Sequence, residues 1–329
     1  MPQPSTVVEA PSRLRSAMYR LLAATVPLVL AAAACASSSD AGAVMGEEAN
    51  GPVVVATTTI WADVVANVAC DGQADVRNLI PAGADPHSFE LALADRATMD
   101  RAALIVANGL FLEEAVADTI ETVEDDGVPV FRFTDHIDTI EYFTSDDHDE
   151  SHDPHVWFDP TRVSAALPAL AERLIDDAGL DPTMVQACLS AYQGELGDVD
   201  SEVSGLVDAV PESNRKLVTN HDSLGYFADR YGFEIVGTVI PASSGLAVTN
   251  PAHLEDLAVQ IEAANVPAIF SESQHSADDA QALANAVTNG VEIVTLVTGA
   301  LSEPGSGQKA ETYLGLLSSN AELITRALS

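Results

Sequence analysis

The sequence predicts an α/β fold: two lobes, each with a small, mostly parallel sheet flanked by helices, joined by one long rigid backbone helix. Two observations predict it. Short apolar runs rich in β-branched residues alternate with helical stretches in both halves of the chain, and this alternation is typical of parallel sheets covered by helices. Between the halves lies a single long stretch in which apolar residues recur at helical spacing.

The first half of the chain contains four runs that predict strands. Val53–Thr58 is apolar and β-branched, and Ile60–Val68, which follows it, has helical spacing. The strand pattern recurs at Val76–Ile80, Ala103–Ala107 and Val128–Phe133. In a parallel sheet, the loops after the carboxyl ends of the strands line the ligand crevice. The residues shortly after each run are therefore the first candidates for a binding site.

One long helix is predicted between the halves. Apolar residues recur every three or four positions over residues 182–210, and Asp181 followed by Pro182 is a typical helix start. The alternating pattern resumes after this segment, with predicted strands at Lys216–Thr219, Glu234–Val239, Ala268–Ser271 and Val291–Val297 and predicted helices at Leu224–Tyr231, Pro251–Ala264, Ala277–Thr288 and Ala310–Leu328. We therefore expect an N-terminal lobe at 52–181, a linker helix at 182–210 and a C-terminal lobe at 211–329.

The net charge of the chain limits the classes of molecule that it is expected to bind. Of 329 residues, 50 are Asp or Glu and 14 are Lys or Arg, which gives a formal net charge of -36 at pH 7. Such a chain repels phosphate backbones, so we expect no nucleic-acid partner, and it raises the local concentration of cations. With 47% hydrophobic residues, the chain has enough apolar side chains to form ordinary globular domains.

The first 34 residues predict a lipoprotein signal peptide. Three arginines precede an apolar run, Leu21–Ala34, that is too short to span a bilayer comfortably. Cys35 follows this run, which resembles the lipobox of bacterial lipoproteins, although Ala32 stands where a larger aliphatic residue is usual. We expect lipid on Cys35 to anchor an extracytoplasmic chain to the cell membrane, with 35–51 as a flexible tether. A buried apolar helix is the alternative.

Export would place the two remaining cysteines in an oxidising compartment, where a disulfide can form. Cys70 and Cys188 are an isolated pair and neither lies in a CxxC motif. A disulfide between them and two separately buried thiols are both open alternatives. Past residue 35, no apolar run approaches the length of a membrane span, so we expect the mature body to be soluble.

Three of the eight histidines are positioned to face a cleft between the lobes. His87 lies in the loop after the run that ends at Ile80, His155 lies in a loop before residue 160, and His221 comes directly after the first predicted strand of the second lobe. A single histidine is more often structural or exposed. Neutral imidazole, however, suits zinc and other borderline divalent metals, and three histidines form an ordinary zinc site.

Longer motifs surround these histidines. They are Asp85-Pro-His87 with Phe89-Glu90, then His155-Val-Trp-Phe-Asp-Pro160, then the run from His221 to Gly232, and finally Ser302-Glu-Pro-Gly305 ahead of Tyr313-Leu-Gly315. In this order, over about the whole mature chain, they resemble the zinc- and manganese-binding subunits of bacterial ABC importers. The resemblance implies metal bound between two lobes by His87, His155 and His221, and delivery to a membrane permease. We expect the chain to be a monomer.

The fourth ligand is where the chain departs from this family. Its members commonly carry an aspartate shortly after the last strand, and this chain has Gly299 there. Either the site keeps three histidines and a water, or a neighbour substitutes. Glu272 and His275 are the candidates, with helix capping or an exposed position as the alternative for each. The lost carboxylate, and His221 where manganese binders often have glutamate, favour Zn2+ over Mn2+ as the transported ion.

Four histidines remain outside this set of candidates. His148 and His152 occur in an acidic segment, residues 145–153. Zinc importers of this family often carry a longer His- and acid-rich loop here, thought to gather or sense metal, and a solvated acidic loop is the alternative. His136 and His253 are expected to be structural or surface residues.

Two other functions are compatible with a metal site. An adhesin or a periplasmic metal buffer on the same scaffold would share the chemistry and differ in its partner. A zinc-dependent hydrolase would need a positioned general base, and the chain has no His-Glu-x-x-His motif, although Asp222 and Glu272 are acidic residues that could serve. We therefore predict a metal receptor and no enzyme.

Overall fold

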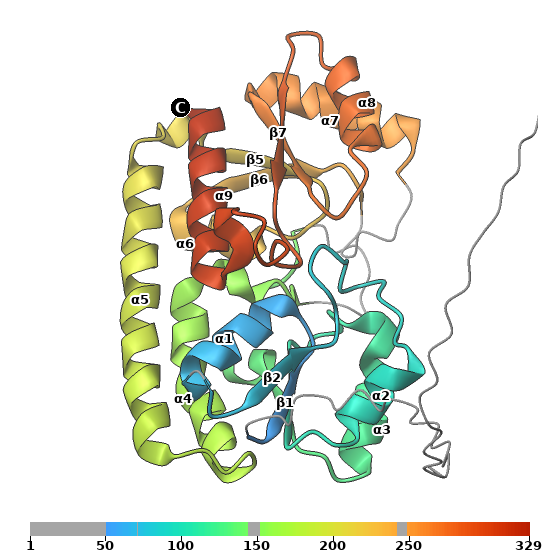
Figure 1. The fold of residues 1–329 in the computed structure, drawn as a ribbon. Helices are drawn as coiled ribbons and strands as arrows, with labels where there is room; N and C mark the ends of the chain where they lie inside the picture. Colours follow the sequence, from blue (N-terminus) through green and yellow to red (C-terminus); the bar gives the residue numbers. More distant parts are fainter. Residues whose placement is uncertain (1–50, 71, 144–151, 242–248) are drawn as a thin grey trace, which may run out of the picture. The chain divides into compact units, whose positions relative to one another are not determined.

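The computed structural model describes residues 51–70, 72–143, 152–241 and 249–329 (Figure 1). The predicted signal peptide, nearly all of the predicted tether, and His148 lie outside these residues. The first half contains β1 (Val53–Ala56), α1 (Thr59–Ala69), β2 (Asp75–Asn78), α2 (Leu93–Met99), β3 (Leu104–Ala107), α3 (Ala117–Asp125), β4 (Val130–Arg132) and α4 (Pro160–Asp176). After α5 (Pro182–Asp208), the second half contains β5 (Lys216–Thr219), α6 (Gly225–Tyr231), β6 (Glu234–Thr238), α7 (Pro251–Ala264), β7 (Ala268–Glu272), α8 (Asp278–Ala286), β8 (Glu292–Leu296) and α9 (Tyr313–Leu328).

Each half contains a four-stranded parallel sheet, which confirms the predicted fold class. The strand orders are β2-β1-β3-β4 and β6-β5-β7-β8, so the second half repeats the order of the first. In the first sheet the chain passes from β1 outward to β2 on one side and from β3 outward to β4 on the other, so the direction of the connections changes between β1 and β3. It changes in the same way between β5 and β7 of the second sheet. Open α/β sheets bind ligands beyond the carboxyl ends of the strands at such points.

The long helix α5 is built as its sequence predicts. The side chain of Asp181 accepts hydrogen bonds from the amides of Thr183 and Met184, and Pro182 occupies the first helical turn. Its buried residues are spaced three or four apart, and they are Val185, Leu189, Tyr192, Leu196, Val199, Val203 and Val207. This buried stripe packs against α1 and α4 of the first half and against α9 of the second (Figure 1). One rigid element therefore contacts both halves.

The hydrophobic core is continuous across the two halves on the α5 side. One cluster contains Val54 and Leu104 of the first sheet together with Leu217 and Phe270 of the second. Two smaller clusters lie on the other faces of the sheets, under α2 and α3 in one case and under α7 and α8 in the other. Because side chains alternate between the faces of a strand, Val55, next to Val54, belongs to a different cluster.

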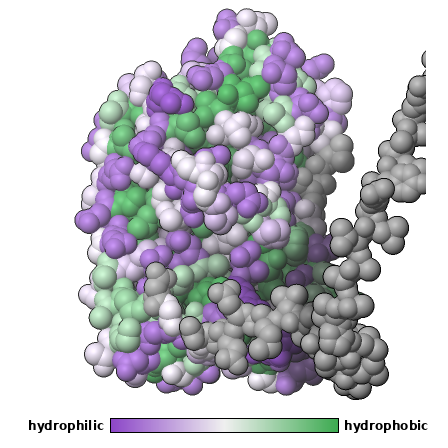
Figure 2. All heavy atoms as spheres, in the orientation of Figure 1, coloured by the Kyte–Doolittle hydropathy of each residue, from purple (hydrophilic) through white to green (hydrophobic). Residues whose placement is uncertain are grey.

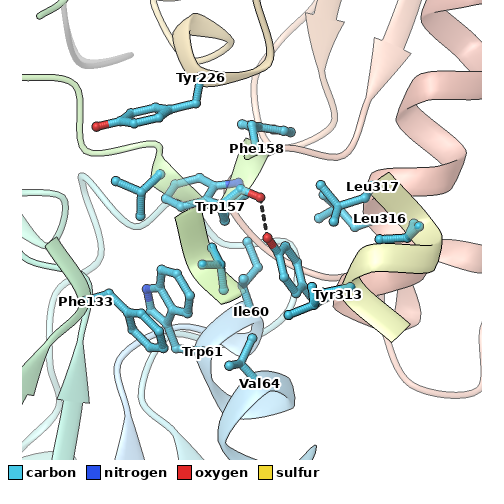
Figure 3. Packing of buried hydrophobic residues seen from close by; sticks show 14 of the residues in the cluster. Ile60, Trp61, Val64, Phe133, Trp157, Phe158, Tyr226, Tyr313, Leu316 and Leu317 are labelled. Atoms are coloured by element: carbon cyan, nitrogen blue, oxygen red, sulfur yellow. Dashed lines mark hydrogen bonds between the residues drawn. The ribbon is translucent and has the colours of Figure 1, made fainter. Parts of the chain in front are cut away.

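Aromatic side chains fill the centre of the continuous cluster, as Figure 3 shows. The rings of Trp61 and Phe133 stack with their centroids 3.7 Å apart. The hydroxyl of Tyr313, from α9, donates a hydrogen bond of 2.5 Å to the backbone carbonyl of Trp157, from the first half. A buried hydrogen bond thus joins the two halves inside the apolar core, where an unpaired partner would be costly.

Some element boundaries differ from the sequence prediction. The first strand ends at Ala56 instead of Thr58, because the hydroxyl of Thr58 accepts a hydrogen bond from the Trp61 amide and begins α1. The last helix begins at Tyr313, after a short 3-10 turn, because Thr312 caps it in the same way. Caps of this kind compete with the preceding strand or turn for the same residues.

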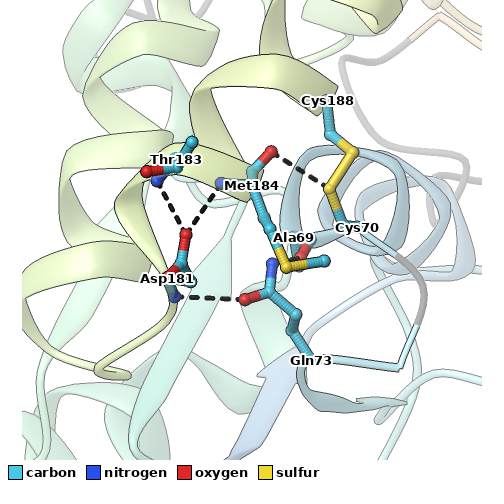
Figure 4. Close-up of a disulfide and its surroundings, with 7 residues drawn as sticks. All are labelled: Ala69, Cys70, Gln73, Asp181, Thr183, Met184 and Cys188. Carbon is cyan, nitrogen blue, oxygen red and sulfur yellow. Dashed lines mark hydrogen bonds between the residues drawn. A yellow bond between two sulfur atoms is a disulfide. The ribbon is translucent and has the colours of Figure 1, made fainter.

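A disulfide joins the end of α1 to α5 (Figure 4). The bonded residues are Cys70 and Cys188, whose Cα atoms are 5.7 Å apart. Beside the disulfide, the amide of Asp181 donates a hydrogen bond to the side-chain oxygen of Gln73, which extends the contact between the two segments. Of the two alternatives for these cysteines, the structure contains the disulfide.

Replacing both Cys70 and Cys188 by serine is expected to lower the free energy of unfolding by about 2–5 kcal/mol. The disulfide closes a long loop, since the cysteines are 118 positions apart, and it therefore restricts the unfolded chain. Urea denaturation of the wild type and the variant under oxidising conditions measures the difference. With a reductant the two proteins should unfold at the same urea concentration, and equal stability without the reductant would contradict the prediction.

The face drawn in Figure 2 mixes hydrophilic and hydrophobic residues. The large apolar side chains that are most exposed in the described part of the chain are Leu93, Phe111, Phe143, Met184 and Val259, which come from separate segments. Single exposed apolar residues of this kind are ordinary on a water-facing surface. Across the described segments, no helix is both long enough and apolar enough to cross a membrane.

Candidate metal centre

The loop after β2 places His87. Oδ1 of Asp85 accepts a hydrogen bond of 3.0 Å from the amide of His87, and Oδ2 of Asp85 accepts one of 2.8 Å from the hydroxyl of Ser88. These bonds form a tight turn in which Asp85 fixes the backbone. Pro86 and His87 are buried, so the turn carries the His87 ring into the protein instead of toward solvent.

His155 is held by its neighbours in the chain. It precedes a 3-10 turn, Val156–Phe158, whose three side chains are buried in the core. Oδ1 of Asp153 lies 2.6 Å from Nδ1 of His155 and accepts a hydrogen bond of 2.8 Å from its amide. A carboxylate that accepts the Nδ1 proton leaves the lone pair of Nε2 free for a metal. Burial raises the pKa of Asp153 to about 7.

The end of β5 places His221, the candidate from the second half. The hydroxyl of Thr219 donates a hydrogen bond of 2.7 Å to the carbonyl of His221. Oε1 of Glu272, at the end of β7, lies 2.6 Å from Nδ1 of His221. Oε2 of Glu272 accepts a hydrogen bond of 2.7 Å from the hydroxyl of Thr298. The carboxylate is therefore fixed on the Nδ1 side of the ring and directs Nε2 away from itself.

The three candidate nitrogens meet at one point. Nε2 of His155 lies 3.3 Å from Nε2 of His87 and 3.2 Å from Nε2 of His221. The ring centroids of the three histidines are 5.0 to 5.6 Å apart. Two ligands of a tetrahedral zinc ion with bonds of 2.0–2.1 Å are about 3.3 Å apart. Nε2 of His155 therefore lies at ligand spacing from Nε2 of each of the other two histidines, and one ligand atom from each of the three residues lies within 4.8 Å of the others.

Burial and charge give the histidines different proton affinities. Burial, with repulsion from the neighbouring histidines, lowers the pKa of His87 and of His155 to about 3. Burial also acts to lower the pKa of His221, but the attraction and hydrogen bond of Glu272 outweigh it and raise this pKa. The pairing with His221 likewise overcomes the effect of burial on Glu272 and lowers its pKa to about 2. Of the three rings, His221 therefore holds a second proton most strongly, whereas His87 and His155 are neutral at neutral pH.

The site is closed around the three rings. The side chains and backbone that bound it come from Asp85, Pro86, His87, His155, His221, Gln274, Thr298 and Gly299, and they leave no space for a water molecule between them. A Cβ atom on Gly299 would lie 2.7 Å from Nε2 of the Gln274 side chain and 2.9 Å from Cδ of Pro86. An aspartate at position 299 would therefore displace Pro86 or Gln274.

Glu272 and His275, the candidate fourth ligands, lie on the far side of His221. Glu272 contacts Nδ1 of His221, as described above, and not the three Nε2 atoms. Nε2 of His275 lies 3.9 Å from Oε2 of Glu272. Glu272 and His275 therefore form a second group with His221, in which one ligand atom from each residue lies within 4.8 Å of the others.

The other histidines of the described chain have local roles. The ring of His136 is exposed and stacks on Phe131, with the centroids 4.8 Å apart. Nε2 of His253 lies 2.8 Å from the carbonyl of Thr238. His152 is exposed and lies outside both groups. The expectation that His136 and His253 are structural or surface residues agrees with these positions.

Sequence reasoning did not assign roles to two residues that position the ligands. Asp153 stands two residues before His155, and the Asp-Pro-His spacing, which also occurs at Asp85, could have indicated a carboxylate that orients the ring. Thr298 fixes Glu272 through its hydroxyl and accepts a hydrogen bond of 3.1 Å from the indole of Trp157 through its carbonyl. No local pattern indicates this second role, because the contact joins residues 141 positions apart.

Known proteins resemble this chain over most of its length. Residues 54–327 match the family model described as ZnuA, zinc-uptake complex component A, periplasmic. The zinc-binding protein TroA of Treponema pallidum is 29% identical over 84% of this chain and 89% of its own length. The manganese-binding lipoprotein MntA of Halalkalibacterium halodurans is 27% identical over 92% of this chain and 96% of its own length.

Solved structures have the same fold. The periplasmic zinc-binding protein TroA from Treponema pallidum superposes with a TM-score of 0.77 at 29% identity, covering 85% of this chain and 99% of that one. A manganese-bound S38A mutant of a periplasmic metal-binding protein from Candidatus Liberibacter asiaticus gives a TM-score of 0.74 at 26% identity, covering 84% of this chain and all of that one. The chain therefore belongs to the family of periplasmic zinc-uptake components, which are metal receptors of importers and not enzymes.

Proposed function

We propose that this chain captures one divalent metal ion, zinc in preference to manganese, between His87, His155 and His221 and delivers it to an ABC permease. The observation that carries the proposal is the convergence of the three Nε2 atoms at ligand spacing, with 3.2 and 3.3 Å between the atoms given above. Asp153 and Glu272 hold the Nδ1 protons of two of these rings, so the free lone pairs face one another. Such an arrangement is favourable only when a cation or a proton lies between them.

The donor set supports zinc. Three imidazole nitrogens and no side-chain carboxylate lie at the centre, because position 299 is glycine and Glu272 is engaged at Nδ1 of His221. Nitrogen donors suit zinc, whereas manganese prefers oxygen donors. The relatives named for zinc and for manganese show that the scaffold accommodates either ion.

The two halves are expected to move little during capture. We propose residues 52–181 and 211–329 as the lobes and 182–210 as the rigid helix between them. The continuous core, the Tyr313–Trp157 hydrogen bond and the Trp157–Thr298 hydrogen bond all cross between these halves. Opening the halves would expose this core to water and would break buried hydrogen bonds.

The mature chain is proposed to act at the membrane surface as a monomer. Residues 1–34 would be removed on export, lipid on Cys35 would anchor the chain, and residues 35–51 would tether it. The family description names a periplasmic protein, and relatives such as MntA are named lipoproteins. Mass spectrometry of the membrane fraction tests this proposal: a diacylglycerol adduct on Cys35 is expected, and a Cys35→Ala variant should appear in the soluble fraction.

Cellular uptake tests the proposed function. Cells that lack the chain should lose high-affinity uptake of radioactive zinc, and the full-length chain should restore it. Crystals grown with zinc should show anomalous scattering from one ion between the three histidines. Restored manganese uptake without zinc uptake would overturn the metal preference, and an ion bound elsewhere would overturn the site.

The pH dependence of binding is expected to be shallower than for three ordinary histidines. A proton competes with the metal only where the pKa of the ligand lies above the pH. His87 and His155, with pKa values of about 3, stay available at pH 5, whereas His221, with its raised pKa, must lose a proton. Three histidines with ordinary pKa values near 6.5 would lose about a thousandfold in affinity per pH unit below that value.

Zinc titrations of the mature chain at pH 6 and pH 5, with a competing chelator of known affinity at each pH, measure this dependence. The loss of affinity should be smaller than a thousandfold. NMR of the metal-free protein at pH 5 should show neutral rings for His87 and His155 and a protonated ring for His221. A thousandfold loss, or three protonated rings, would contradict the expectation.

A further inference from the structure

A second group of metal-binding side chains lies directly behind the three-histidine site. It consists of His221, Glu272 and His275, and one ligand atom from each lies within 4.8 Å of the others. Glu272 and His275 come from the end of β7 and the loop after it, so both are on the same half as His221. The two groups share His221 and no other residue.

His275 has features that a purely structural histidine would not need. Its Nε2 atom is buried and has no hydrogen-bond partner, and the nearest carboxylate oxygen, Oε2 of Glu272, is 3.9 Å away. This distance is too long for a hydrogen bond. A buried polar atom without a partner is costly, so its position requires an explanation. The ring centroids of His275 and His221 are 5.8 Å apart, similar to the spacing within the three-histidine site.

Exposure distinguishes the two groups. The side chain of His275 is 15% exposed, whereas those of His221 and Glu272 are 3% and 2% exposed. The three-histidine site has no space for water, as described above. Among the five candidate ligands, His275 is therefore the one that an ion from solvent can reach with the smallest movement.

His221 can serve either group, because a neutral imidazole carries one proton on either ring nitrogen. With the proton on Nδ1, donated to Glu272, the lone pair of Nε2 faces His87 and His155. With the proton on Nε2, the lone pair of Nδ1 faces Glu272, whose other carboxylate oxygen lies 3.9 Å from Nε2 of His275. The two groups therefore use opposite nitrogens of one ring, and a single neutral His221 can complete only one of them at a time.

We propose that His221, Glu272 and His275 form a second, weaker metal position, and that the ion passes through it on its way into or out of the three-histidine site. The proposal rests on the proposed function, since it assigns a route to the same ion. Imidazole nitrogen and carboxylate oxygen are both zinc ligands, with bonds of about 2.0–2.2 Å, so an ion at this position would draw the three ligand atoms together. One ion should bind per wild-type chain, because filling one position withdraws His221 from the other.

The test removes the first site and retains the second. In the mature chain, His87→Ala with His155→Ala should leave weak zinc binding that calorimetry detects. Adding His275→Phe, which keeps a ring and removes its nitrogens, should lower this residual affinity about tenfold or more. Adding His136→Ala instead, at an exposed histidine outside both groups, should leave the residual binding unchanged. A double variant that binds no zinc, or one that His275→Phe does not weaken, would overturn the second position.

The route is tested with the first site intact. His275→Phe alone should slow the transfer of zinc to a fluorescent chelator severalfold in stopped-flow measurements, whereas the control His136→Ala should leave the transfer rate unchanged. An unchanged transfer rate would overturn the route. Failure of the proposed function is distinguishable, because the double variant would then bind zinc as tightly as the wild type.

Discussion

Replacing His87, His155 and His221 together by alanine is expected to abolish tight metal binding. Two of the Nε2 distances in this set, 3.2 and 3.3 Å, match the ligand spacing of zinc, and no other described group has three histidines. A ligand present at a thousand times its dissociation constant stabilises the native protein by about 4 kcal/mol. Zinc should therefore raise the unfolding temperature of the wild type and leave that of the triple variant unchanged, as calorimetry at neutral pH can measure.

The matched control replaces two histidines that lie outside the site. His136 stacks on Phe131 and His253 contacts the carbonyl of Thr238, and neither approaches the three rings. The variant His136→Ala with His253→Ala should bind one zinc ion with wild-type affinity. A triple variant that retains the wild-type zinc affinity would eliminate the assignment of the site.

Replacing Trp157 by alanine is expected to have the largest effect on stability. Its side chain is 1% exposed and lies in the core that joins the halves (Figure 3). Loss of a buried tryptophan costs about 3–5 kcal/mol. The same variant should bind zinc more weakly, because the Trp157 ring packs against His155, with the centroids 5.3 Å apart, and its indole donates a hydrogen bond to Thr298.

Urea denaturation and zinc titration of Trp157→Ala, with and without metal, separate the two effects. Trp157→Phe, which keeps an aromatic ring and loses the indole donor, should fall between the wild type and the alanine variant in both measurements. Phe111→Ala removes an aromatic residue that is 63% exposed and should change stability by less than 1 kcal/mol, as is usual for surface positions. A loss of stability below 1 kcal/mol in Trp157→Ala would show that the halves do not depend on this core.

These expectations describe a receptor that keeps its halves together and controls the metal through side chains. The hydrogen bonds from Trp157 and Tyr313 cross between the halves inside the core, so a wide opening would break them. The two carboxylates behind the rings, Asp153 and Glu272, keep the free lone pairs of His155 and His221 directed inward.

The elements of the fold could be predicted from sequence because their signals are local. The apolar run at Val53 and the three- and four-residue spacing of apolar residues along α5 are the patterns of a strand and of a helix. Both patterns can be recognised within a short segment of the chain. Helix α4 (Pro160–Asp176) is not among the helices predicted from the sequence. It begins at Pro160 directly after the buried 3-10 turn, and Asp159 caps it by accepting hydrogen bonds from the amides of Thr161 and Arg162. Its start is therefore tied to the packing of Trp157 and Phe158.

The sequence by itself predicted the order of the strands along the chain and the three histidines proposed as ligands, which follow strand ends or lie on loops. These depend on residue chemistry and on local periodicity. Only the tertiary structure decided that Glu272 lies behind His221, that Gly299 packs against Pro86, and that Cys70 bonds Cys188. Such contacts join residues far apart in the chain. Their geometry depends on how the two sheets and α5 pack together, and this packing cannot be predicted from any short segment of the sequence.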